Sequence, residues 1–507
     1  MPDTSLLYRS LPSVDVLLKK VFSQCEKEAP ASSRKQEDSV CVLNNAEVPH
    51  ALVKEGVNAF LDALRHSIAS GAITSPDALK LDCLFAGLMA HLRQYTRPRL
   101  RRVLNATGVI IHTNLGRSPL ADEAVKAVEE VARNYSNLEF SLETGKRGSR
   151  HSLVEADICA LTGAEAAMVV NNNAAAVFLL LDTLCRGREV ILSRGQLVEI
   201  GGSFRIPDVM AKSGAILREV GTTNRTRIAD YQTAITEHTV ALMRVHTSNY
   251  RIVGFHAETL RSELVALGRE KNLPVFEDMG SGFFCDFARM GQQHLPTDEP
   301  TVQQLIAEGI DVVTFSGDKV LGGPQAGIIA GKKAFIDQLK KNPLARALRT
   351  DKMTLAALSA TLRLYREPDL AMRRIPTLAM ICATEADLKK KATKLGRAFT
   401  RHFATHTANR VNNPDVSLSN TGQLSCSVVP TDSAVGGGSF PEHGLPGFML
   451  RVQVAGMTAD TLRQQLLHGR IPLVARLVDE AVCLDVRTLR EEEFPLVVEA
   501  FSDALAG

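Results

Sequence analysis

The strongest constraint on the fold is an alternation of short apolar segments with helical patterns between about residue 100 and residue 345. The apolar segments are rich in β-branched residues, as buried strands are, and helical stretches separate most of them. They are AAMVV, EVILS, GAILREV, VALMRVH, LPVFED, DVVTFSG and AGIIAG. This order is typical of βαβ units, which build a mostly parallel sheet covered by helices. We therefore expect an α/β domain over residues 96–345.

The flanking regions predict two further domains, because 507 residues are too many for one ordinary core. Residues 1–95 carry short helical patterns at 14–21, 53–67 and 78–92, with a polar stretch, KEAPASSRKQEDS, between the first two. Residues 346–507 combine long helical patterns with the strand-like segment FMLRVQV. We expect a helical N-terminal domain and a small α+β C-terminal domain.

The composition favours a cytoplasmic globular protein. Hydrophobic residues make up 45% of the chain and charged residues 23%, and the net charge is only +3. Any polyanionic partner must then be bound by local patches and not by a global field. The nine cysteines occur singly, without a C-x-x-C pair, which argues for a reducing compartment and against a disulfide or zinc scaffold. We expect no bound metal, no signal peptide and no membrane-spanning segment.

One lysine follows a predicted buried strand. In DVVTFSGDKVLGGPQAGIIAG, residues 311–331, the strand ends at Ser316, and Lys319 comes just before two glycines. Loops at the carboxyl ends of such strands usually bind ligands. A partly buried lysine there has a lowered pKa and reacts readily with aldehydes. The alternative is a solvated lysine that closes a strand.

An acid ends a second predicted strand and suggests a partner for the lysine. Asp278 follows the segment LPVFE, and a helical pattern separates it from Lys319. An acid that meets a ring nitrogen, together with a lysine that forms an imine, is what pyridoxal phosphate requires. Asp278 as a plain helix N-cap is the alternative.

A run of amides is a candidate phosphate site. The segment AAMVV leads into residues 171–173, all asparagine, and then into an apolar helical pattern. Backbone N–H groups and the dipole at a helix N-terminus favour anions, and Asn172 and Asn173 would lie there. Ser316 is a further candidate phosphate ligand, although serine is common in turns.

Longer motifs resemble one family over nearly the whole chain. They include NATGVIIHTNLGRSPL, VNNNAAAV, LVEIGGSFRIPDVM, EVGTTNRT, VHTSNY, FSGDKVLGGPQAGIIAGKK and PLARALRTDKMTLAALSATLRLY. Together they are similar to the bacterial selenocysteine synthases, the L-seryl-tRNA(Sec) selenium transferases. The resemblance implies a fold-type I pyridoxal phosphate enzyme that is a cytoplasmic homodecamer. It implies that seryl-tRNA(Sec) is converted through aminoacrylyl-tRNA to selenocysteinyl-tRNA(Sec), with selenophosphate as the selenium donor.

The same resemblance implies roles for individual residues. Lys319 would carry the cofactor as a Schiff base, and Asp278 would pair with its pyridine nitrogen. The family's anion-binding residues for the selenium donor are matched by three arginines, Arg117, Arg346 and Arg349. If Arg346 and Arg349 lie on one helix, their spacing of three places them on one face. Each arginine would alternatively form only a surface ion pair.

Three further residues have open roles. His246 in VHTSNY is a candidate neighbour of the cofactor ring, but the chain has thirteen histidines and a structural role is an equal alternative. Gln196 stands where an acid is expected from the resemblance, so it receives no catalytic role. Cys285 invites a selenium-carrier role, although a lone cysteine is more often a small buried hydrophobe.

Two other functions compete with this interpretation. The first is a pyridoxal phosphate lyase or aldolase that acts on a free amino acid, for which Arg451 would bind the α-carboxylate. The second is a non-catalytic RNA-binding protein, against which the pair of Lys319 and Asp278 argues. Basic residues of the N-terminal region, such as Lys19 and Arg99, favour tRNA binding there, with a solvated surface as the alternative.

Overall fold

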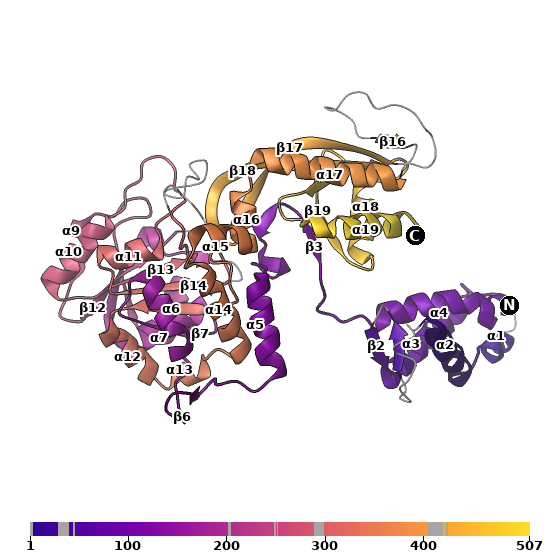
Figure 1. Cartoon of the computed structure of the whole chain (residues 1–507), viewed down its shortest axis with the longest axis horizontal. Coiled ribbons are helices and arrows are strands. Elements are labelled where there is room, and N and C mark those ends of the chain that lie inside the picture. The colour runs from indigo at the N-terminus through magenta and orange to yellow at the C-terminus, as the bar shows by residue number, and fades with distance from the viewer. Residues whose placement is uncertain are drawn as a thin grey trace. The chain divides into compact units, whose positions relative to one another are not determined.

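The computed structural model describes residues 4–28, 40–43, 46–200, 204–247, 250, 252–287, 299–403, 419–421 and 424–506. The chain divides into two compact units, residues 1–102 and residues 103–507. In Figure 1 the first unit has the indigo end of the colour scale, and the second unit runs from magenta to yellow. Residues 29–39, which form most of the polar stretch KEAPASSRKQEDS, lie outside the described part of the chain.

The first unit consists of helices and one short antiparallel hairpin, β1–β2. The helices bury one apolar face each, and Leu17, Val57, Leu61 and Leu88 meet in a common core. The elements are α1 (Thr4–Ser10), α2 (Val14–Glu28), β1 (Val40–Leu43), β2 (Ala46–Pro49), α3 (His50–Ala69), η2 (Pro76–Leu79) and α4 (Leu81–Tyr95). The helical patterns expected at 14–21 and 53–67 are confirmed, whereas the pattern at 78–92 is divided by the extended residue Lys80 into the end of η2 and most of α4.

One cysteine of this unit departs from the expectation. Cys25 in α2 is disulfide-bonded. The sequence argued against a disulfide scaffold, and this single bonded cysteine is an exception to that pattern, because two cysteines need only be close in the fold, not in the sequence, to form a bond. Among the described residues, seven other cysteines, including Cys285, form no disulfide.

A seven-stranded sheet dominates the second unit, in the order β11-β8-β12-β13-β14-β15-β7. Adjacent strands from β11 to β14 are parallel, while β15 runs antiparallel to both of its neighbours. The strands are β7 (Ala166–Val170), β8 (Glu189–Ser193), β11 (Ile216–Val220), β12 (Thr239–Val245), β13 (Val275–Gly280), β14 (Val312–Ser316) and β15 (Gly327–Gly331). Five lie within segments predicted from the sequence, whereas β12 starts one residue before its segment and β13 ends two residues after its own. The mostly parallel sheet is confirmed.

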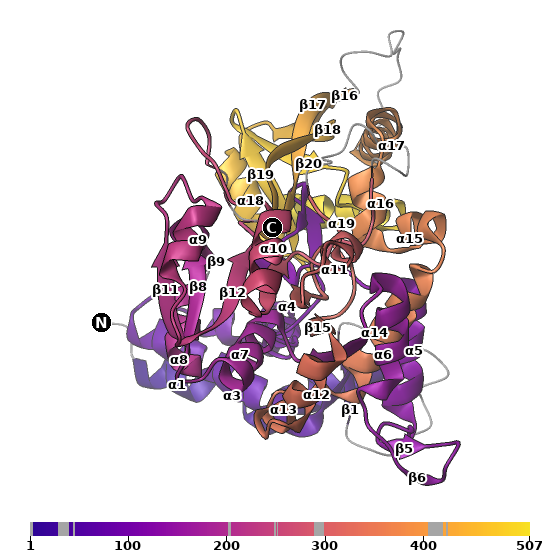
Figure 2. The ribbon, with the colours of Figure 1, turned by 90° about the vertical axis from the view of Figure 1, so that its left-hand side faces the viewer.

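Helices cover both faces of this sheet, so its strands are buried on both sides. Apolar residues of α6, α9, α10, α11 and α14 pack on one face, and those of α7, α8, α12 and α13 on the other. Figure 2 shows α6 and α14 on one side of the sheet and α7 and α8 on the other. The helices are α5 (Asp122–Arg133), α6 (Ser152–Thr162), α7 (Asn173–Leu184), α8 (Ile206–Ser213), α9 (Ile228–Ala234), α10 (Arg261–Lys271), α11 (Val302–Glu308), α12 (Lys333–Lys341), α13 (Leu344–Ala347) and α14 (Lys352–Leu364).

A second sheet, in the order β16-β17-β18-β20-β19-β3, carries the C-terminal part of the chain. Two strands from the start of the second unit join this sheet: β3 (Leu104–Ala106) pairs with β19, and β4 (Val109–Ile111) pairs with β17. The other strands are β16 (Ser419–Thr421), β17 (Leu424–Gly436), β18 (Ser439–Val454), β19 (Leu473–Val478) and β20 (Ala481–Asp485). The later helices are α15 (Pro368–Arg374), α16 (Pro376–Cys382), α17 (Glu385–Phe403), α18 (Ala459–His468) and α19 (Phe494–Ala506). This mixture of strands and helices is the α+β arrangement expected for the C-terminal region.

Short elements complete the second unit. They are η3 (Thr113–Leu115), β5 (Phe140–Ser141), β6 (Lys146–Arg147), η4 (Arg194–Gln196), β9 (Glu199–Ile200), β10 (Phe204–Arg205) and η5 (Glu491–Glu493). Among the helices of the described residues, none has both the length and the apolar character needed to cross a bilayer.

Candidate active site

Lys319 lies in the loop that leads from β14 to β15, and the backbone of this loop is held from several sides. The hydroxyl of Ser118 donates to the Lys319 carbonyl oxygen at 2.6 Å, and the N–H of Gly322 donates to the same oxygen at 2.9 Å. The hydroxyl of Tyr365 donates to the carbonyl oxygen of Leu321 at 2.8 Å. Lys319 is only 6% exposed. The amine therefore belongs to a fixed, buried loop and is not a solvated group at the end of a strand.

Asp278 lies on β13, the strand adjacent to β14, and is 3% exposed. The side-chain amide of Asn173 donates to its Oδ1 at 2.7 Å, and the hydroxyl of Thr314 donates to the same oxygen at 3.2 Å. Neither bond occupies Oδ2. Asp278 is thus a carboxylate that the surrounding side chains orient, and its predicted alternative as a helix cap does not apply, because it is part of a strand.

The pKa values of the two groups show that they share one site. Burial lowers the pKa of the Lys319 amine, and the nearby charge of Arg117 lowers it further, although Asp278 and Asp318 act in the opposite direction. Burial raises the pKa of Asp278, against the hydrogen bond from Asn173 and the charge of Lys319. Each charge influences the other, and burial outweighs this attraction in both cases. Burial therefore shifts the pKa of the Lys319 amine downward, toward the neutral form.

The asparagine run lies where β7 meets α7. Asn172 is the N-cap of α7, and its Oδ1 accepts from the backbone N–H of Ala175 at 2.9 Å. A Cβ on Gly327 would lie 2.0 Å from the Asn172 carbonyl oxygen, so only glycine allows this approach. Gly327 pairs in register with Ser316, which is 5% exposed. Asn172 and Ser316 are thus brought to the same edge of the sheet, next to the N-terminus of a twelve-residue helix.

Arg117 approaches Lys319 from the loop after β4. Gly116 and Arg117 both have left-handed backbones, with φ of 91° and 62°, at the turn that carries this guanidinium. Arg117 Nη1 lies 2.8 Å from Oδ2 of Asp318, whose side chain is 9% exposed. Sequence reasoning predicted Arg117 but missed Asp318. The available signal was its position next to the lysine at the end of a buried strand.

Arg346 and Arg349 do not share a helix face. Arg346 lies in the last turn of α13, whereas α13 ends at Ala347 and Arg349 forms an isolated antiparallel bridge with Val170. The expectation of one helical face was wrong, because the helix is only four residues long. Both side chains are exposed. Since Val170 is the last residue of β7, Arg349 lies at the edge of the sheet where the asparagine run begins, and its Nη1 is 3.6 Å from Oε1 of Glu139.

His246 is linked to Asp278 through the backbone. Its N–H donates to the Asp278 carbonyl oxygen at 2.8 Å, and its Nε2 lies 2.6 Å from Oε2 of Glu299. Burial by itself would lower the pKa of His246, but the hydrogen bond and the charge of Glu299 outweigh it, so the pKa is raised. Glu299, which the sequence analysis did not single out, keeps this imidazole protonated to higher pH.

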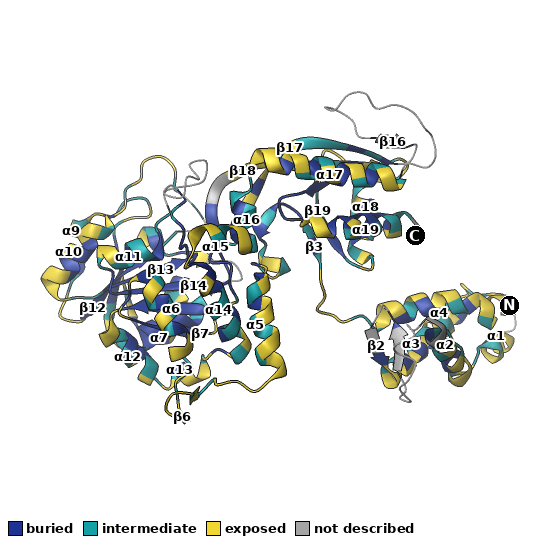
Figure 3. Cartoon of the chain, in the orientation of Figure 1, coloured by how far each residue is buried: buried dark blue, intermediate teal, exposed yellow. Residues whose placement is uncertain are grey.

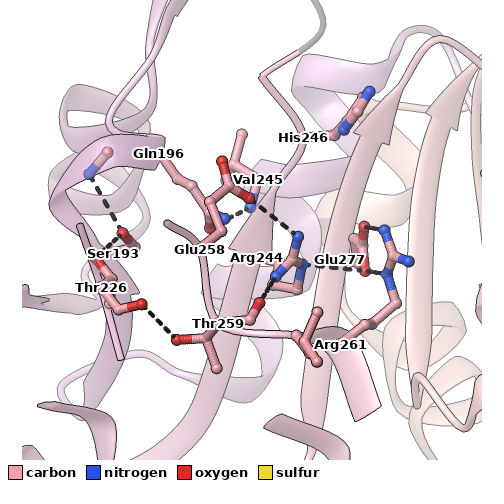
Figure 4. A network of polar contacts seen from close by, with 12 residues as sticks. Ser193, Gln196, Thr226, Arg244, Val245, His246, Glu258, Thr259, Arg261 and Glu277 are labelled. Atoms are coloured by element: carbon pink, nitrogen blue, oxygen red, sulfur yellow. Dashed lines mark hydrogen bonds and ion pairs between the residues drawn. The ribbon is translucent and has the colours of Figure 1, made fainter. Parts of the chain in front are cut away.

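A buried ion cluster lies beside these residues in β12 and β13 (Figure 4). Glu277 accepts from Nε and Nη2 of Arg261 at 2.8 and 3.1 Å, and Nε of Arg244 is 3.7 Å from the same carboxylate. Since side chains alternate along a strand, Glu277 and Asp278 face opposite sides of the sheet. The cluster therefore holds β13 in place from the side that Asp278 does not face.

Gln196 and Cys285, whose roles were open, have structural contacts. Gln196 is 3% exposed, and its Oε1 accepts from the backbone N–H of Val245 at 3.2 Å, which ties the loop after β8 to the end of β12 (Figure 4). Cys285 is buried, and burial raises the pKa of its thiol to about 12. A thiol with that pKa carries almost no thiolate at neutral pH, which favours the small buried hydrophobe over a selenium carrier.

Comparison with known proteins identifies the family. The SelA family model, described as L-seryl-tRNA selenium transferase, matches residues 103–490. The chain belongs to this family. The L-seryl-tRNA(Sec) selenium transferase of Desulfomicrobium baculatum is 53% identical over 502 residues, which cover 99% of this chain and 100% of the relative. That of Solidesulfovibrio magneticus is 54% identical over 500 residues, which cover 98% of each chain. The resemblance inferred from the motifs is confirmed.

Among solved structures, D-glucosaminate-6-phosphate ammonia-lyase matches with a TM-score of 0.53 and 20% identity. The match covers 80% of this chain and 96% of that chain. At this identity the likeness concerns the fold alone. It agrees with the family match, and the expected α/β fold of fold-type I is confirmed.

Proposed function

We propose that this chain converts L-seryl-tRNA(Sec) to L-selenocysteinyl-tRNA(Sec) through aminoacrylyl-tRNA, with selenophosphate as donor and pyridoxal phosphate as cofactor. One observation carries the proposal: a buried lysine and a buried aspartate, Lys319 and Asp278, interact at the ends of two strands in a chain about half identical to selenium transferases. The family membership supplies the reaction, and the site supplies the groups that it needs.

The residues at the site fit pyridoxal phosphate. Within the described residues, Oδ1 of Asn173 and Oγ of Ser281 are buried polar atoms without a hydrogen-bond partner, as expected where a polar ligand binds. The close approach at Gly327 leaves the N-terminus of α7 open for a phosphate, with Ser316 beside it. Asp278 would pair with the ring nitrogen of the cofactor. His246 lies next to Asp278, since its backbone N–H donates to the Asp278 carbonyl oxygen. When bound, the cofactor withdraws electrons from the substrate's α-carbon.

Lys319 is the proposed link to the cofactor and the group that moves the Cα proton. Its lowered pKa favours the neutral amine, which is the form that reacts with an aldehyde and the form that accepts a proton. Ser118 fixes the lysine backbone through its carbonyl oxygen, so the amine can return to one position after each step. Asp318, held by Arg117, adds a negative charge beside the amine that stabilises its protonated form.

Arg117, Arg346 and Arg349 are the proposed ligands of selenophosphate. Arginine forms paired, charge-assisted hydrogen bonds with tetrahedral oxyanions and stays protonated at working pH. The exposure of Arg346 and Arg349 and the position of Arg349 beside the asparagine run support an entry site for an anion. Arg117 shares its charge with Asp318, so its availability depends on that pair.

The donor site is testable separately from the cofactor site. We expect Arg349→Ala and Arg346→Ala to raise the selenophosphate concentration needed for half-maximal rate by tenfold or more, since one lost charge-assisted bond is worth about 1.5–3 kcal/mol. Formation of aminoacrylyl-tRNA should continue. Arg218→Ala, at an exposed position on β11, is the matched control. If the substitutions stop dehydration and leave the selenophosphate dependence unaltered, the arginines belong to the cofactor site or to the fold.

The alternative function, a lyase or aldolase that acts on a free amino acid, expected Arg451 to bind the substrate's α-carboxylate, and the position of Arg451 does not support this. Arg451 lies on β18 of the second sheet, and its Nη2 donates to the carbonyl oxygen of Asp479 at 2.8 Å. It pairs in register with Cys483 and Ser427, not with any strand of the seven-stranded sheet. An aminoacyl ester has no free α-carboxylate, so seryl-tRNA does not require Arg451 at the site.

The deciding experiment is a visible spectrum of the purified protein, followed by borohydride reduction and peptide mapping. We expect a yellow protein whose reduced cofactor is attached to Lys319, turnover of seryl-tRNA(Sec), and no turnover of free serine. A Lys319→Ala protein in which borohydride still attaches the cofactor to another lysine would overturn the site. Activity on free serine without RNA would favour the rival lyase, and an uncoloured protein that binds RNA would favour the non-catalytic alternative.

We also propose that the enzyme works as a cytoplasmic homo-oligomer, a decamer by family resemblance. Exposed apolar residues between α5 and α6 support contact between copies: Tyr135 is fully exposed, and Phe140 and Leu142 are 49% and 76% exposed. Apolar groups gathered on a surface mark interaction sites. Mass photometry of the purified protein tests this, and a monomer at micromolar concentration would contradict it.

A further inference from the structure

Helix α17 has an unusual distribution of charge. Its acids, Glu385 and Asp387, are confined to the first turn, whereas residues 388–403 contain no acid. The same stretch holds six lysines and arginines: Lys389, Lys390, Lys391, Lys394, Arg397 and Arg401. A solvated helix usually mixes the two signs, because pairs of opposite charge one turn apart stabilise it. The excess of one sign needs another explanation.

The cations at 390, 394, 397 and 401 form a single stripe. They are spaced by four, three and four residues, which places them on one side of an α-helix, and all are exposed. The opposite side is buried in the core of the second sheet, through Leu388, Ala392, Leu395 and Phe399. Figure 3 shows exposed residues along the outer side of α17, which packs on β17 and β18. We call these four residues the α17 stripe.

Half of the α17 stripe has its charge uncompensated. Lys390 lies 3.3 Å from Asp387, and Lys394 pairs with Glu491. Within the described residues, Arg397 and Arg401 have neither an ion pair nor a hydrogen bond from the side chain. A cation near a helix C-terminus is favoured by the helix dipole, which would account for Arg401 but not for Arg397, almost two turns from the end. The pair is free to bind an external anion.

We propose that the α17 stripe binds the phosphate backbone of the tRNA substrate, as a second RNA surface separate from the first unit. The stripe extends over eleven residue steps from Lys390 to Arg401, about 16 Å at about 1.5 Å per residue, a length along which a nucleic-acid duplex presents several phosphates. Arginines without partners are suited to phosphates, and the near-neutral chain offers no global field that would replace them. Structured RNA is read mainly through its shape and backbone, which requires cations on a rigid element. The inference rests on the proposed use of seryl-tRNA.

The test uses the full-length holoenzyme and the double variant Arg397→Gln/Arg401→Gln. The tRNA dissociation constant is measured by fluorescence anisotropy at several salt concentrations. Each lost phosphate contact should reduce the slope of log K against log salt by about 0.7–0.9, so the double variant should lose about 1.4–1.8 of slope. At 0.15 M salt the same relation predicts roughly 10- to 30-fold weaker binding. Turnover at saturating tRNA and the cofactor spectrum should stay unchanged, and Arg397→Lys/Arg401→Lys should restore most of the affinity.

Lys212→Gln/Arg218→Gln is the matched control, since it removes two exposed charges from α8 and β11. An equal loss of affinity in the control would mean that only net charge matters and would overturn the proposal. So would an unchanged slope in the α17 variant. If mass photometry shows that the α17 variant dissociates the oligomer, the stripe is a contact between subunits and not an RNA surface. A parent enzyme that does not bind tRNA at all would instead refute the proposed function.

Discussion

Replacing Asp278 by two different residues separates its structural contacts from its role toward the cofactor. Both side-chain hydrogen bonds that it receives, from Asn173 at 2.7 Å and from Thr314 at 3.2 Å, reach the same oxygen, Oδ1. An asparagine can keep an oxygen at that position, while it loses the charge and replaces Oδ2 by an amide NH2 group. An alanine removes both acceptors. The two variants therefore differ in stability for a reason that the geometry supplies.

The expected stabilities follow from the burial of this group, which is 3% exposed. In Asp278→Ala the amide of Asn173 and the hydroxyl of Thr314 lose their acceptor, at about 1–3 kcal/mol for each buried group, or about 2–6 kcal/mol together. In Asp278→Asn both bonds persist and a buried charge is removed, so the free energy of unfolding should change by less than about 1 kcal/mol. Urea unfolding of the cofactor-free proteins measures both values.

The functional loss should be shared by the two variants. Neither side chain can neutralise a protonated ring nitrogen, and loss of one charge-assisted hydrogen bond, about 1.5–3 kcal/mol, corresponds to roughly 10- to 150-fold weaker cofactor binding. Equilibrium dialysis measures the affinity, and formation of selenocysteinyl-tRNA measures the activity. An Asp278→Asn enzyme with parental cofactor affinity and turnover would refute the assigned role. Equal stability of the two variants would refute the hydrogen bonds.

Three other outcomes are expected. Gly327→Ala should abolish cofactor retention, because its Cβ would lie 2.0 Å from a backbone oxygen, whereas the control Gly87→Ala, whose Cβ has no neighbour closer than 4.0 Å, should be tolerated; absorbance of the purified proteins distinguishes them. Glu299→Gln should lower the raised pKa of His246 and destabilise the protein by about 1.5–3 kcal/mol below about pH 6.5, with the difference disappearing as the pH rises through the parental His246 pKa; thermal unfolding at a series of pH values checks the sign. Removal of the first compact unit should weaken tRNA binding at fixed salt far more than the α17 variant does, and it should leave the cofactor spectrum intact, since the second unit has its own cores.

The sheet was predictable because its strands are buried on both faces. A strand with helices on both sides needs apolar residues at every position, and β7, β14 and β15 are buried throughout. Such runs are distinctive in a sequence. The direction of β15 was not predictable, because the pattern of a buried strand is the same whether its neighbours run parallel or antiparallel.

The site was predictable only where function depends on the end of a strand. Lys319 and Asp278 could be placed together because the carboxyl ends of parallel strands meet at one edge. Contacts between distant segments left no such signal: Asp318 meets Arg117 across 201 positions, and Glu299 meets His246 across 53.

Two pairs of arginines show that helical spacing in the sequence predicts a shared helix face in one case and not in the other. Arg346 and Arg349 have the separation of residues on one helix face, but α13 ends between them and Arg349 continues into a bridge with Val170. Arg397 and Arg401 have the same kind of spacing, and here the helix persists, because Leu395 and Phe399 anchor it in a core. Spacing predicts a shared face only where an apolar stripe of the same period holds the helix together. A stripe of cations opposite such an apolar stripe is therefore a stronger indication of a binding surface than the cations alone.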